Sequence, residues 1–581
     1  MEKIWKLKEL AGSNGSDHEE SIDNFITEMR ALRTNIQVPE MILRLLFSRG
    51  ITNYAKTVKF FKPTKERLYD PFLLKDGQKA SERISDIIAS KEKIMVLGDY
   101  DVDGTCGVSM FYLFLKHFGV DSIIYIPDRI EEGYGISEKA INLAHEQGIK
   151  LIVSIDCGIT AYDKVEYAKT LGIDFIICDH HRPPDRIPDA FAVLDPIRED
   201  DTYPFKYLCG TGVAFKLIQG ACKLMKEEEF AYTLLDFVAI ATASDIVPLI
   251  DENRIILHEG LEMINNNPRP SIRTILEASG VTPGTLNTAK IVFTLAPRIN
   301  AVGRLGDAKR AVEMLTSIDD EELVKLADEL NEENLNRREI DKTITEHAIR
   351  ECEELVVESS NYTLVVHNED WHPGVIGIVA ARLVEKFHLP SVVLTTVNGV
   401  AKGSARSITG FNIYEALKKC EHELIQFGGH YHAAGLEIEI DKIDGFKTML
   451  NKIASEELSQ DQLLPEMLID AELSFEDISN QFVKILTFFE PYGPENMTPI
   501  FTTKKVQIVG DVRYAKSHTH IFRVKEEESE LVFDAVFFSS EKFHDDIQPG
   551  RYCDICYSID NNYWNGAYKT KLRIRDIKFP Y

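Results

Sequence analysis

The sequence predicts an α/β protein built around a parallel β-sheet flanked by helices, and three observations support this fold class. Short apolar runs alternate with helix-like segments between residues 76 and 318. Residues 319–356 are rich in Glu, Leu, Lys and Arg and contain neither Gly nor Pro, which is typical of one long helix. A second, smaller alternating region and a strand-rich tail follow. Strands that alternate with helices form parallel sheets whose faces are both covered.

The predicted elements divide the chain into five parts. The first part is polar and helical in pattern, and the second contains expected strands at 93–97, 122–126, 150–155 and 174–178. The fourth part opens with an expected strand at 362–366. In the last part, Asn565-Gly566 between apolar residues indicates a β-hairpin. The expected limits are residues 1–75, 76–318, 319–356 for the connecting helix, 357–460 and 461–581.

Composition narrows the class of protein. The chain has 581 residues, and single hydrophobic cores stop growing beyond roughly 250–300 residues, so several domains are expected. Neither a signal peptide nor an apolar run of about 20 residues is visible, so we expect a cytoplasmic protein without membrane association. The net charge of −27 argues against a protein that coats nucleic acid, but it does not exclude a nuclease.

Acidic and histidine residues follow three of the predicted strands. These motifs are Asp99-Tyr-Asp101-Val-Asp103-Gly, Ser-Ile-Asp156-Cys-Gly and Asp179-His180-His181. Asp245 ends a further apolar segment, residues 238–244. Because a parallel sheet presents its functional loops beyond the carboxyl ends of its strands, we expect these side chains to meet at one edge of the sheet.

Converging carboxylates repel one another unless cations neutralise them. Carboxylate oxygens with one or two imidazoles suit Mn²⁺ or Mg²⁺. Two such ions roughly 3.5–4 Å apart can bind a phosphate and generate hydroxide, which predicts phosphoester hydrolysis. An EF-hand calcium loop is the alternative for the first motif. Its twelfth position would be Met110 instead of Glu, and a strand precedes it, so we set this alternative aside.

The four motifs resemble those of the DHH phosphoesterases in order and spacing. By that resemblance, the metal ligands would be Asp101, Asp103, Asp156, His180 and Asp245. Asp99 would lie in or near the metal coordination sphere, and His181 would orient ligands or approach the phosphate. The resemblance also implies a two-metal site for Mn²⁺ or Mg²⁺ and catalytic roles for these aspartates and histidines.

Glycine-rich segments in the fourth part predict a phosphate-binding surface, because glycine lets the backbone approach a phosphate closely. Gly428-Gly-His430-x-x-Ala-Ala-Gly435 is similar to the signature of the DHHA1 domain, which follows the DHH domain in this family. That resemblance assigns substrate binding to Ser404, Arg406 and His430, and extends it to His372. Tight turns between strands and helices are the alternative explanation.

Further segments resemble those of the RecJ exonucleases within the DHH family. They add Arg129, Arg298, Asn300 and Arg304 as substrate-binding candidates, with solvated or ion-paired arginines as the alternative. Basic and aromatic residues in the tail are compatible with an OB-like β-barrel that stacks bases, and RecJ proteins carry an OB-fold after the DHHA1 domain.

The resemblance therefore implies a metal-dependent 5′-to-3′ exonuclease that hydrolyses single-stranded DNA, releases 5′ mononucleotides, and acts in DNA repair and recombination. A single-strand-binding protein or a helicase is a candidate partner. One alternative is a phosphodiesterase of the same superfamily that acts on short oligonucleotides or cyclic dinucleotides. Another is an inactive RecJ-like module that binds nucleic acid, against which the full acidic and histidine set argues.

Overall fold

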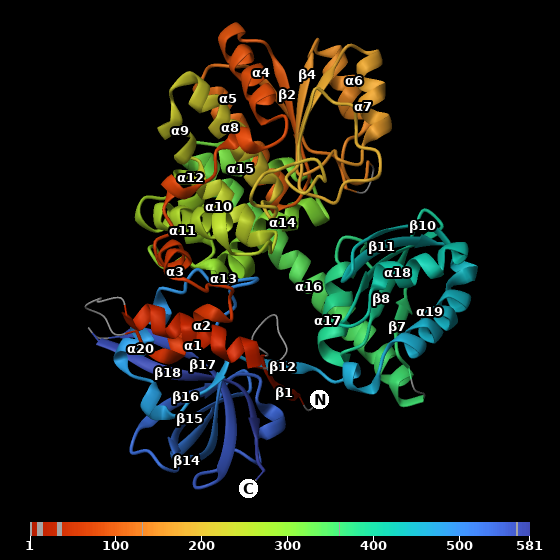
Figure 1. Ribbon diagram of the computed structural model, residues 1–581. Helices are drawn as coiled ribbons and strands as arrows, with labels where there is room; N and C mark the ends of the chain where they lie inside the picture. Colours follow the sequence, from red (N-terminus) through yellow and green to blue (C-terminus); the bar gives the residue numbers. More distant parts are fainter. Residues whose placement is uncertain are drawn as a thin grey trace. The chain divides into compact units, whose positions relative to one another are not determined.

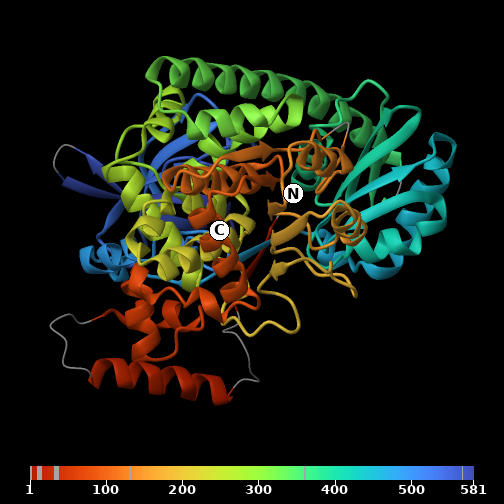
Figure 2. The ribbon, with the colours of Figure 1, turned by 90° about the horizontal axis from the view of Figure 1, so that it is seen from above.

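The computed structural model describes residues 3–8, 16–31, 38–129, 132–358, 361–564 and 567–580 (Figures 1 and 2). Two compact units share the chain. The first consists chiefly of Arg83–Val193 and Asn267–Pro465, and the second consists of Lys3–Glu82, Leu194–Asn266 and Glu466–Tyr581. Each unit is described separately below.

The first unit contains the predicted parallel sheet, with strand order β3-β2-β4-β5-β6. Helices α6 and α7 cover one face through a shared apolar core, and α5 packs on the other side of β2 and β3 (Figure 1). The strands are β2 (Ile94–Gly98), β3 (Ser122–Tyr125), β4 (Leu151–Ile155), β5 (Asp174–Cys178) and β6 (Ala192–Leu194), and the helices are α5 (Val102–His117), α6 (Glu138–Glu146) and α7 (Tyr162–Thr170).

The predicted connecting helix is α16, Asp320–Glu358, which appears as the long green helix in Figure 2. It packs against α14 (Ala296–Leu305), which carries three of the predicted substrate residues. Between α13 (Thr288–Lys290) and α14, residues Ile291–Leu295 form a π-helical turn. Helices α12 (Pro270–Ala278) and α15 (Lys309–Thr316) complete this helical part of the first unit.

The second sheet of the first unit is mixed, with order β10-β11-β9-β8-β7, and β7 and β8 are parallel. Alternate residues of β7 point to opposite faces: Val365 joins the core under α18 and α19, while Leu364 and Val366 join the core under α16 and α17. The elements are β7 (Leu364–His367), α17 (Ile376–Phe387), β8 (Ser391–Val397), β9 (Val400–Arg406), α18 (Ile413–Lys419), β10 (Leu424–Gly429), β11 (Ala433–Ile438) and α19 (Ile443–Glu457).

The second unit contains a closed five-stranded barrel. The ring runs β14-β15-β16-β18-β17 and closes through the pairing of β14 with β17, which confirms the predicted OB-like barrel. Trp564 pairs with Ala567 at the tip of the β17–β18 hairpin, while the predicted turn Asn565-Gly566 itself lies outside the described residues. The strands are β14 (Phe501–Ala515), β15 (Thr519–Glu526), β16 (Val532–Phe537), β17 (Tyr552–Trp564) and β18 (Ala567–Lys578).

Segments from both ends of the chain build the core of the second unit. Helices α1 (Ser16–Ala31) and α2 (Glu40–Phe47) contribute Phe25 and Leu46 to the same apolar cluster as Phe501 and Tyr557 of the barrel. The first strand, β1 (Ile4–Leu7), pairs in parallel with β12 (Glu466–Ile469). The segment that we expected to be helical therefore also contains a strand. The other elements are α3 (Tyr54–Phe61), α8 (Gly210–Met225), α9 (Glu228–Tyr232), α10 (Leu235–Ser244), α11 (Asp251–Asn266), β13 (Ala471–Glu472) and α20 (Asn480–Thr487).

One local expectation is wrong. The apolar residues before Asp245, which we grouped with the strand ends, belong to helix α10. Nearly every residue of this helix is buried, so its sequence is apolar all around and lacks the amphipathic period by which a helix is recognised. Within the part of the chain that the structure describes, no helix combines the length and apolarity needed to cross a bilayer.

Candidate metal centre and substrate site

The turn between β2 and α5 positions the first three aspartates. Asp101 caps the helix: its Oδ1 accepts hydrogen bonds from the N–H groups of Asp103 (2.9 Å) and Gly104 (3.2 Å), as N-cap residues do. Asp103 lies in the first turn, where the helix dipole favours negative charge. A Cβ on Gly104 would lie 2.3 Å from the carbonyl oxygen of Asp99, so only glycine permits this close approach of helix and strand end.

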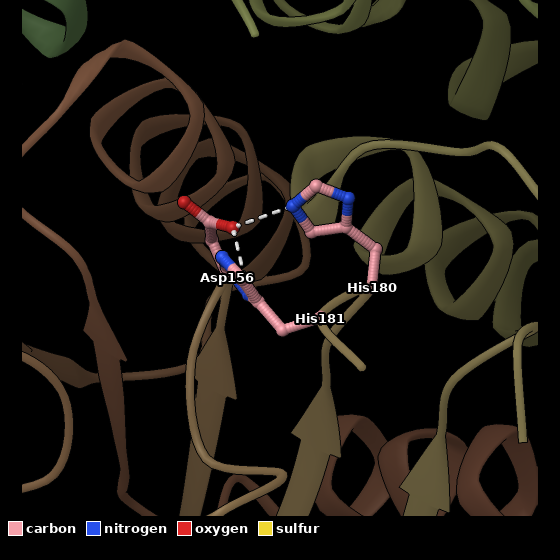
Figure 3. Close-up of side chains that lie close together, drawn as sticks. All are labelled: Asp156, His180 and His181. Carbon is pink, nitrogen blue, oxygen red and sulfur yellow. Dashed lines mark ion pairs between the residues drawn. The ribbon is translucent and has the colours of Figure 1, made fainter. Parts of the chain in front are cut away.

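The ends of β4 and β5 supply the next residues. Asp156 directly follows β4, with a φ of +62°, a left-handed conformation that Asp tolerates better than most side chains. Its backbone N–H donates to the carbonyl of Cys178 at the end of β5 (2.9 Å), so the two strand ends are joined there. His180 Nε2 lies 3.2 Å from Asp156 Oδ1 (Figure 3). The same nitrogen lies 3.8 Å from Asp103 Oδ2.

These side chains form two overlapping groups with the geometry of a metal centre. Ligand atoms of Asp99, Asp101 and Asp156 lie within 4.8 Å of one another, and so do those of Asp156, His180 and His181 (Figure 3). Asp156 belongs to both groups. Asp99 Oδ1 is buried and has no hydrogen-bond partner among the described residues, so a cation would satisfy it. The residues fit Mn²⁺ or Mg²⁺, which prefer oxygen ligands.

The electrostatics of the turn also favour a cation. Burial, followed by the charge of Asp101, raises the pKa of Asp99 well above its usual value. Burial, followed by the charge of Asp103, raises the pKa of Asp101 in the same way. Burial lowers the pKa of His180, which leaves the imidazole neutral and able to donate a lone pair. Crowded carboxylates that resist ionisation become stable as anions when a divalent cation neutralises them.

Asp245, the remaining predicted ligand, directly follows α10 in the second unit. Its backbone N–H donates to the carbonyl of Ala241 (2.9 Å), so it continues the last turn of that helix. Its role as a metal ligand stays a prediction.

The smaller sheet of the first unit brings Ser404 and Arg406 together. Both lie on β9, and Arg406 donates to Ser404 Oγ (3.0 Å) and to the carbonyl of Ala405 (2.8 Å). A Cβ on Gly377, in the first turn of α17, would lie 3.0 Å from Ser404 Oγ, so glycine lets the start of this helix approach the pair. Backbone N–H groups at a helix start, a hydroxyl and a guanidinium are the donors that a phosphate requires.

The two predicted histidines of this part lie in turns. His430 donates its backbone N–H to the carbonyl of Ala433 (2.8 Å), which closes the turn between β10 and β11. Burial lowers the pKa of His430, and the positive charges of His181 and Arg182 lower it further. His372 Nδ1 accepts the N–H of Gly374 (3.0 Å), so this ring is fixed within its own loop.

Several guanidinium groups of the first unit influence one another. Burial lowers the pKa of Arg304 to about 10, and the charges of Arg129, Arg337 and Arg406 contribute to this shift. Burial and then the charge of Arg129 lower the pKa of Arg406. Arg304 also donates to the carbonyl of Gly374 (3.2 Å). A group of cations that repel one another is stabilised when an anion binds, which suits a nucleic-acid phosphate.

Arg298 and Asn300 form hydrogen bonds that join α14 to neighbouring segments of the first unit. Arg298 donates to Asn331 of α16 (3.1 Å) and to the carbonyl of Thr294 in the π-helical turn (2.6 Å). Asn300 Oδ1 accepts the N–H of Val102 at the start of α5 (3.1 Å). The structure therefore gives Asn300 a further role, because it supports the turn that carries Asp101 and Asp103. The predicted contacts of both residues with substrate stay predictions.

Sequence reasoning missed two residues of this site. Asp179 was part of the recognised motif but received no role, yet its carboxylate holds His181 Nδ1 (2.7 Å) and the backbone N–H of His180 (2.8 Å). The second residue is Tyr134, whose hydroxyl donates to the carbonyl of Asp156 (2.9 Å) and lies 3.3 Å from His181 Nδ1. The presence of Asp179 inside the motif was the available signal, while nothing near Tyr134 in the sequence indicated its partner.

Three family models match the chain. They are the DHH family, N-terminal domain, over residues 93–242, the DHHA1 domain over residues 360–456, and the RecJ OB domain over residues 469–576. They match the parallel sheet, the mixed sheet and the barrel described above.

Curated relatives and a solved structure agree with these matches. The single-stranded-DNA-specific exonuclease RecJ of Bacillus subtilis is 36% identical over 554 residues, which cover 94% of this chain and 69% of the relative. The protein of the same name from Salmonella typhimurium is 32% identical over 93% of this chain and 96% of the relative. The crystal structure of RecJ in complex with Mn²⁺ from Thermus thermophilus shares the fold, with a TM-score of 0.81 at 24% identity over 100% of this chain and 80% of that one. Given these matches over nearly its whole length, the chain belongs to the RecJ family.

Proposed function

We propose that the protein is a metal-dependent exonuclease that hydrolyses phosphodiester bonds of single-stranded DNA from the 5′ end and releases 5′ mononucleotides. The observation that carries this proposal is the convergence of Asp99, Asp101 and Asp156 with His180 and His181 at adjacent strand ends. The relatives are named single-stranded-DNA-specific exonucleases, and their sequence similarity extends over nearly the whole chain.

The aspartates and His180 would hold two Mn²⁺ or Mg²⁺ ions. In this proposal the ligands are Asp99, Asp101, Asp103, Asp156, His180 and Asp245. Bound ions of this kind polarise a phosphate, supply hydroxide at neutral pH and stabilise the leaving oxygen. The chain itself contributes the positions of the ligands: Asp101 is fixed by its capping bonds, and Asp156 by the bond from its N–H to Cys178. His181, held by Asp179 and near the hydroxyl of Tyr134, would contact the scissile phosphate.

The donors of the smaller sheet support the 5′ polarity. A terminal 5′ phosphate carries more charge than an internal one, so it needs more donors than an internal phosphate does. Ser404, Arg406 and the start of α17 offer a hydroxyl, a guanidinium and backbone N–H groups in one place. We assign the terminal phosphate to this group, with His430 and His372 beside it, and the following phosphates to Arg129, Arg298, Asn300 and Arg304.

The barrel supports single-stranded DNA as the substrate, in preference to a short oligonucleotide or a cyclic dinucleotide. The barrel is closed and of OB type, and it has exposed Arg513 near the end of β14 and exposed Lys516 in the β14–β15 turn. Basic groups on such a barrel are suited to binding single strands. A role in DNA repair and recombination, a cytoplasmic location and a single-strand-binding protein or a helicase as partner complete the proposal.

The proposal is tested with single strands labelled at one end. With Mn²⁺ or Mg²⁺, a 5′ label should appear at once as a mononucleotide, while a 3′ label should remain in progressively shorter strands. The Asp156→Asn variant should lose at least about a thousandfold in rate, because about 4 kcal/mol of transition-state stabilisation would disappear with this carboxylate. Asp174→Asn, at the exposed start of β5, is the matched control and should keep full activity. Release of the 3′ label first, or near-normal activity of a folded Asp156→Asn variant, would contradict the proposal.

A further inference from the structure

Two histidines of the barrel form a second nitrogen-rich group. His520 lies on β15 and is 1% exposed, whereas His544 is exposed and directly follows the 3-10 helix Glu541–Phe543 between β16 and β17. His520 Nε2 and His544 Nδ1 lie only 3.2 Å apart. The pair belongs entirely to the second unit.

Ser540 lies beside His520, with its Oγ 2.7 Å from Nδ1. The same hydroxyl can donate to the carbonyl of Phe537 (2.8 Å) or to that of His518 (3.0 Å). When it does, Oγ accepts the proton of His520 Nδ1, and in this tautomer the Nε2 lone pair faces His544. Burial, followed by the charge of His544, lowers the pKa of His520 and keeps this ring neutral near pH 7.

Tyr514 of β14 fixes the orientation of both rings. Its ring centroid lies 4.6 Å from that of His520 and 4.5 Å from that of His544. The Tyr514 hydroxyl is held by His518 Nδ1 at 2.7 Å. The two facing nitrogens are thus held in place by packing and hydrogen bonds, as preorganised ligands are.

The spacing of the nitrogens matches metal coordination. Zn²⁺ binds imidazole nitrogen at about 2.0–2.1 Å in a tetrahedral arrangement, so two ligating nitrogens lie about 3.3–3.4 Å apart. The observed 3.2 Å is close to this value. Histidines that bind metal also donate their other ring N–H to a protein acceptor, and Ser540 Oγ, 2.7 Å from His520 Nδ1, is placed to be such an acceptor.

We propose that His520 Nε2 and His544 Nδ1 bind a Zn²⁺-like transition-metal ion, with water in the remaining positions, at a site built from residues other than those of the carboxylate centre. Two imidazoles suit Zn²⁺, Ni²⁺ or Cu²⁺, whereas Mg²⁺ prefers oxygen. The ion would link β15 to the segment between β16 and β17, and so stabilise the barrel. A hydrogen bond between two neutral imidazoles is the competing explanation for the short distance.

Zinc binding to the full-length protein tests the proposal. The protein is kept in excess Mg²⁺ and titrated with Zn²⁺ against a chromophoric chelator. In the His544→Phe variant the ring that contacts Tyr514 remains but both nitrogens are lost. His422→Phe is the control, because His422 is also an exposed histidine and belongs to the first unit. The wild type and His422→Phe should bind one equivalent more than His544→Phe. Zinc that replaces Mg²⁺ at the carboxylate centre is common to all three proteins and cancels in this comparison. Equal stoichiometry in the three would overturn the proposal.

Thermal unfolding separates the metal from the hydrogen bond. Zn²⁺ should raise the Tm of the wild type and of His422→Phe more than that of His544→Phe, compared with the same proteins in a chelator. If the histidines only hydrogen-bond to each other, His544→Phe lowers the Tm without zinc, and the zinc-dependent change is the same in all three proteins. That second result would also overturn the proposal.

Discussion

Asp179 lies beside the candidate metal cluster and positions two of its histidines, although Asp179 itself is not among the candidate ligands. Its Oδ1 accepts the N–H groups of His180 (2.8 Å) and His181 (3.2 Å) and the ring of His181 (2.7 Å), while Oδ2 accepts the N–H of Ile159 (2.9 Å). Burial alone would raise the pKa of Asp179, but these interactions, led by that with His181, outweigh burial and lower it. The carboxylate therefore stays ionised and fixes the two histidines.

The Asp179→Asn variant should therefore need a higher Mn²⁺ concentration for activity than the wild type. An amide keeps the size of the side chain but lacks the charge that holds His181, so we expect the Mn²⁺ concentration for half-maximal activity to rise about 10–100-fold. Activity measured across a Mn²⁺ titration gives this value, and circular dichroism checks the fold. If a folded variant follows the same titration curve as the wild type, Asp179 does not position the ligands.

Arg406 offers a second prediction at the residue scale, on the polarity of digestion. A charge-assisted hydrogen bond contributes roughly 1.5–3 kcal/mol, so Arg406→Ala should reduce the preference for 5′-phosphorylated over 5′-hydroxyl ends by at least about tenfold. The ratio of kcat/KM for the two substrates measures this preference. Lys402→Ala on the same strand is the control, because Lys402 is paired with Glu437 (3.1 Å) and should leave the ratio unchanged. Equal ratios for Arg406→Ala and the wild type would assign Arg406 another role.

At the scale of elements, the turn between β2 and α5 combines three structural requirements in six residues. Asp101 must cap the helix, Gly104 must lack a side chain so that the helix start can approach Asp99, and Asn300 must accept the N–H of Val102. The turn also holds Asp99, Asp101 and Asp103 close together in a buried position, which is unfavourable for the metal-free protein. Burial, followed by the charge of a neighbouring aspartate, raises the pKa of Asp99 and of Asp101.

The metal should therefore stabilise the protein more strongly as the pH rises. A carboxyl whose pKa is raised by folding binds its proton more tightly in the folded state, so the metal-free protein gains stability from this source as pH falls toward the usual value of 3.8. Metal binding requires the ionised form and releases the protons. The difference in Tm with and without Mn²⁺ should thus grow between about pH 5.5 and 8. A Tm difference that stays constant over this range would show that Asp99 and Asp101 are already ionised in the metal-free protein.

At the scale of the whole molecule, the C-terminal part of the chain, beyond residue 465, does not form a hydrophobic core by itself. Phe25 and Leu46 near the start of the chain share one core with Phe501 of the barrel, and β1 pairs with β12. Removing all residues beyond 465 would therefore destroy a core and would not test DNA binding alone. Point substitutions on the exposed turn of the barrel are the cleaner experiment.

The double variant Arg513→Ala, Lys516→Ala should weaken binding of long single strands. Each lost phosphate contact lowers the slope of log K against log salt by about 0.7, so the slope should fall by about 1.4. Cleavage of very short oligonucleotides should change much less, because they need only the metal centre and the smaller sheet. Fluorescence anisotropy at several salt concentrations measures the slope, with Lys504→Ala, whose side chain pairs with Glu472 (2.8 Å), as control. An unchanged slope would show that Arg513 and Lys516 are not part of the DNA-binding surface.

The sequence by itself determined the fold class and most of the candidate metal cluster. Short apolar strands followed by Asp99, Asp156 and Asp179 are local features, and the parallel arrangement that they predict places their carboxyl ends at one edge. The long helix α16 and the five-stranded barrel were also predictable, because helix-forming residues without Gly or Pro and regular strand patterns report on local structure.

Only the tertiary structure decided the features that depend on distant segments. The helix before Asp245 has no amphipathic period because its surroundings are apolar on every side, so its sequence does not distinguish it from a strand. The bonds from Tyr134 to Asp156 and from Val102 to Asn300, and the core that α1 and α2 share with the barrel, join residues that local patterns do not relate. The physical reason is that periodicity and capping are set by neighbours along the chain, whereas such contacts are set by which surfaces meet when the chain folds.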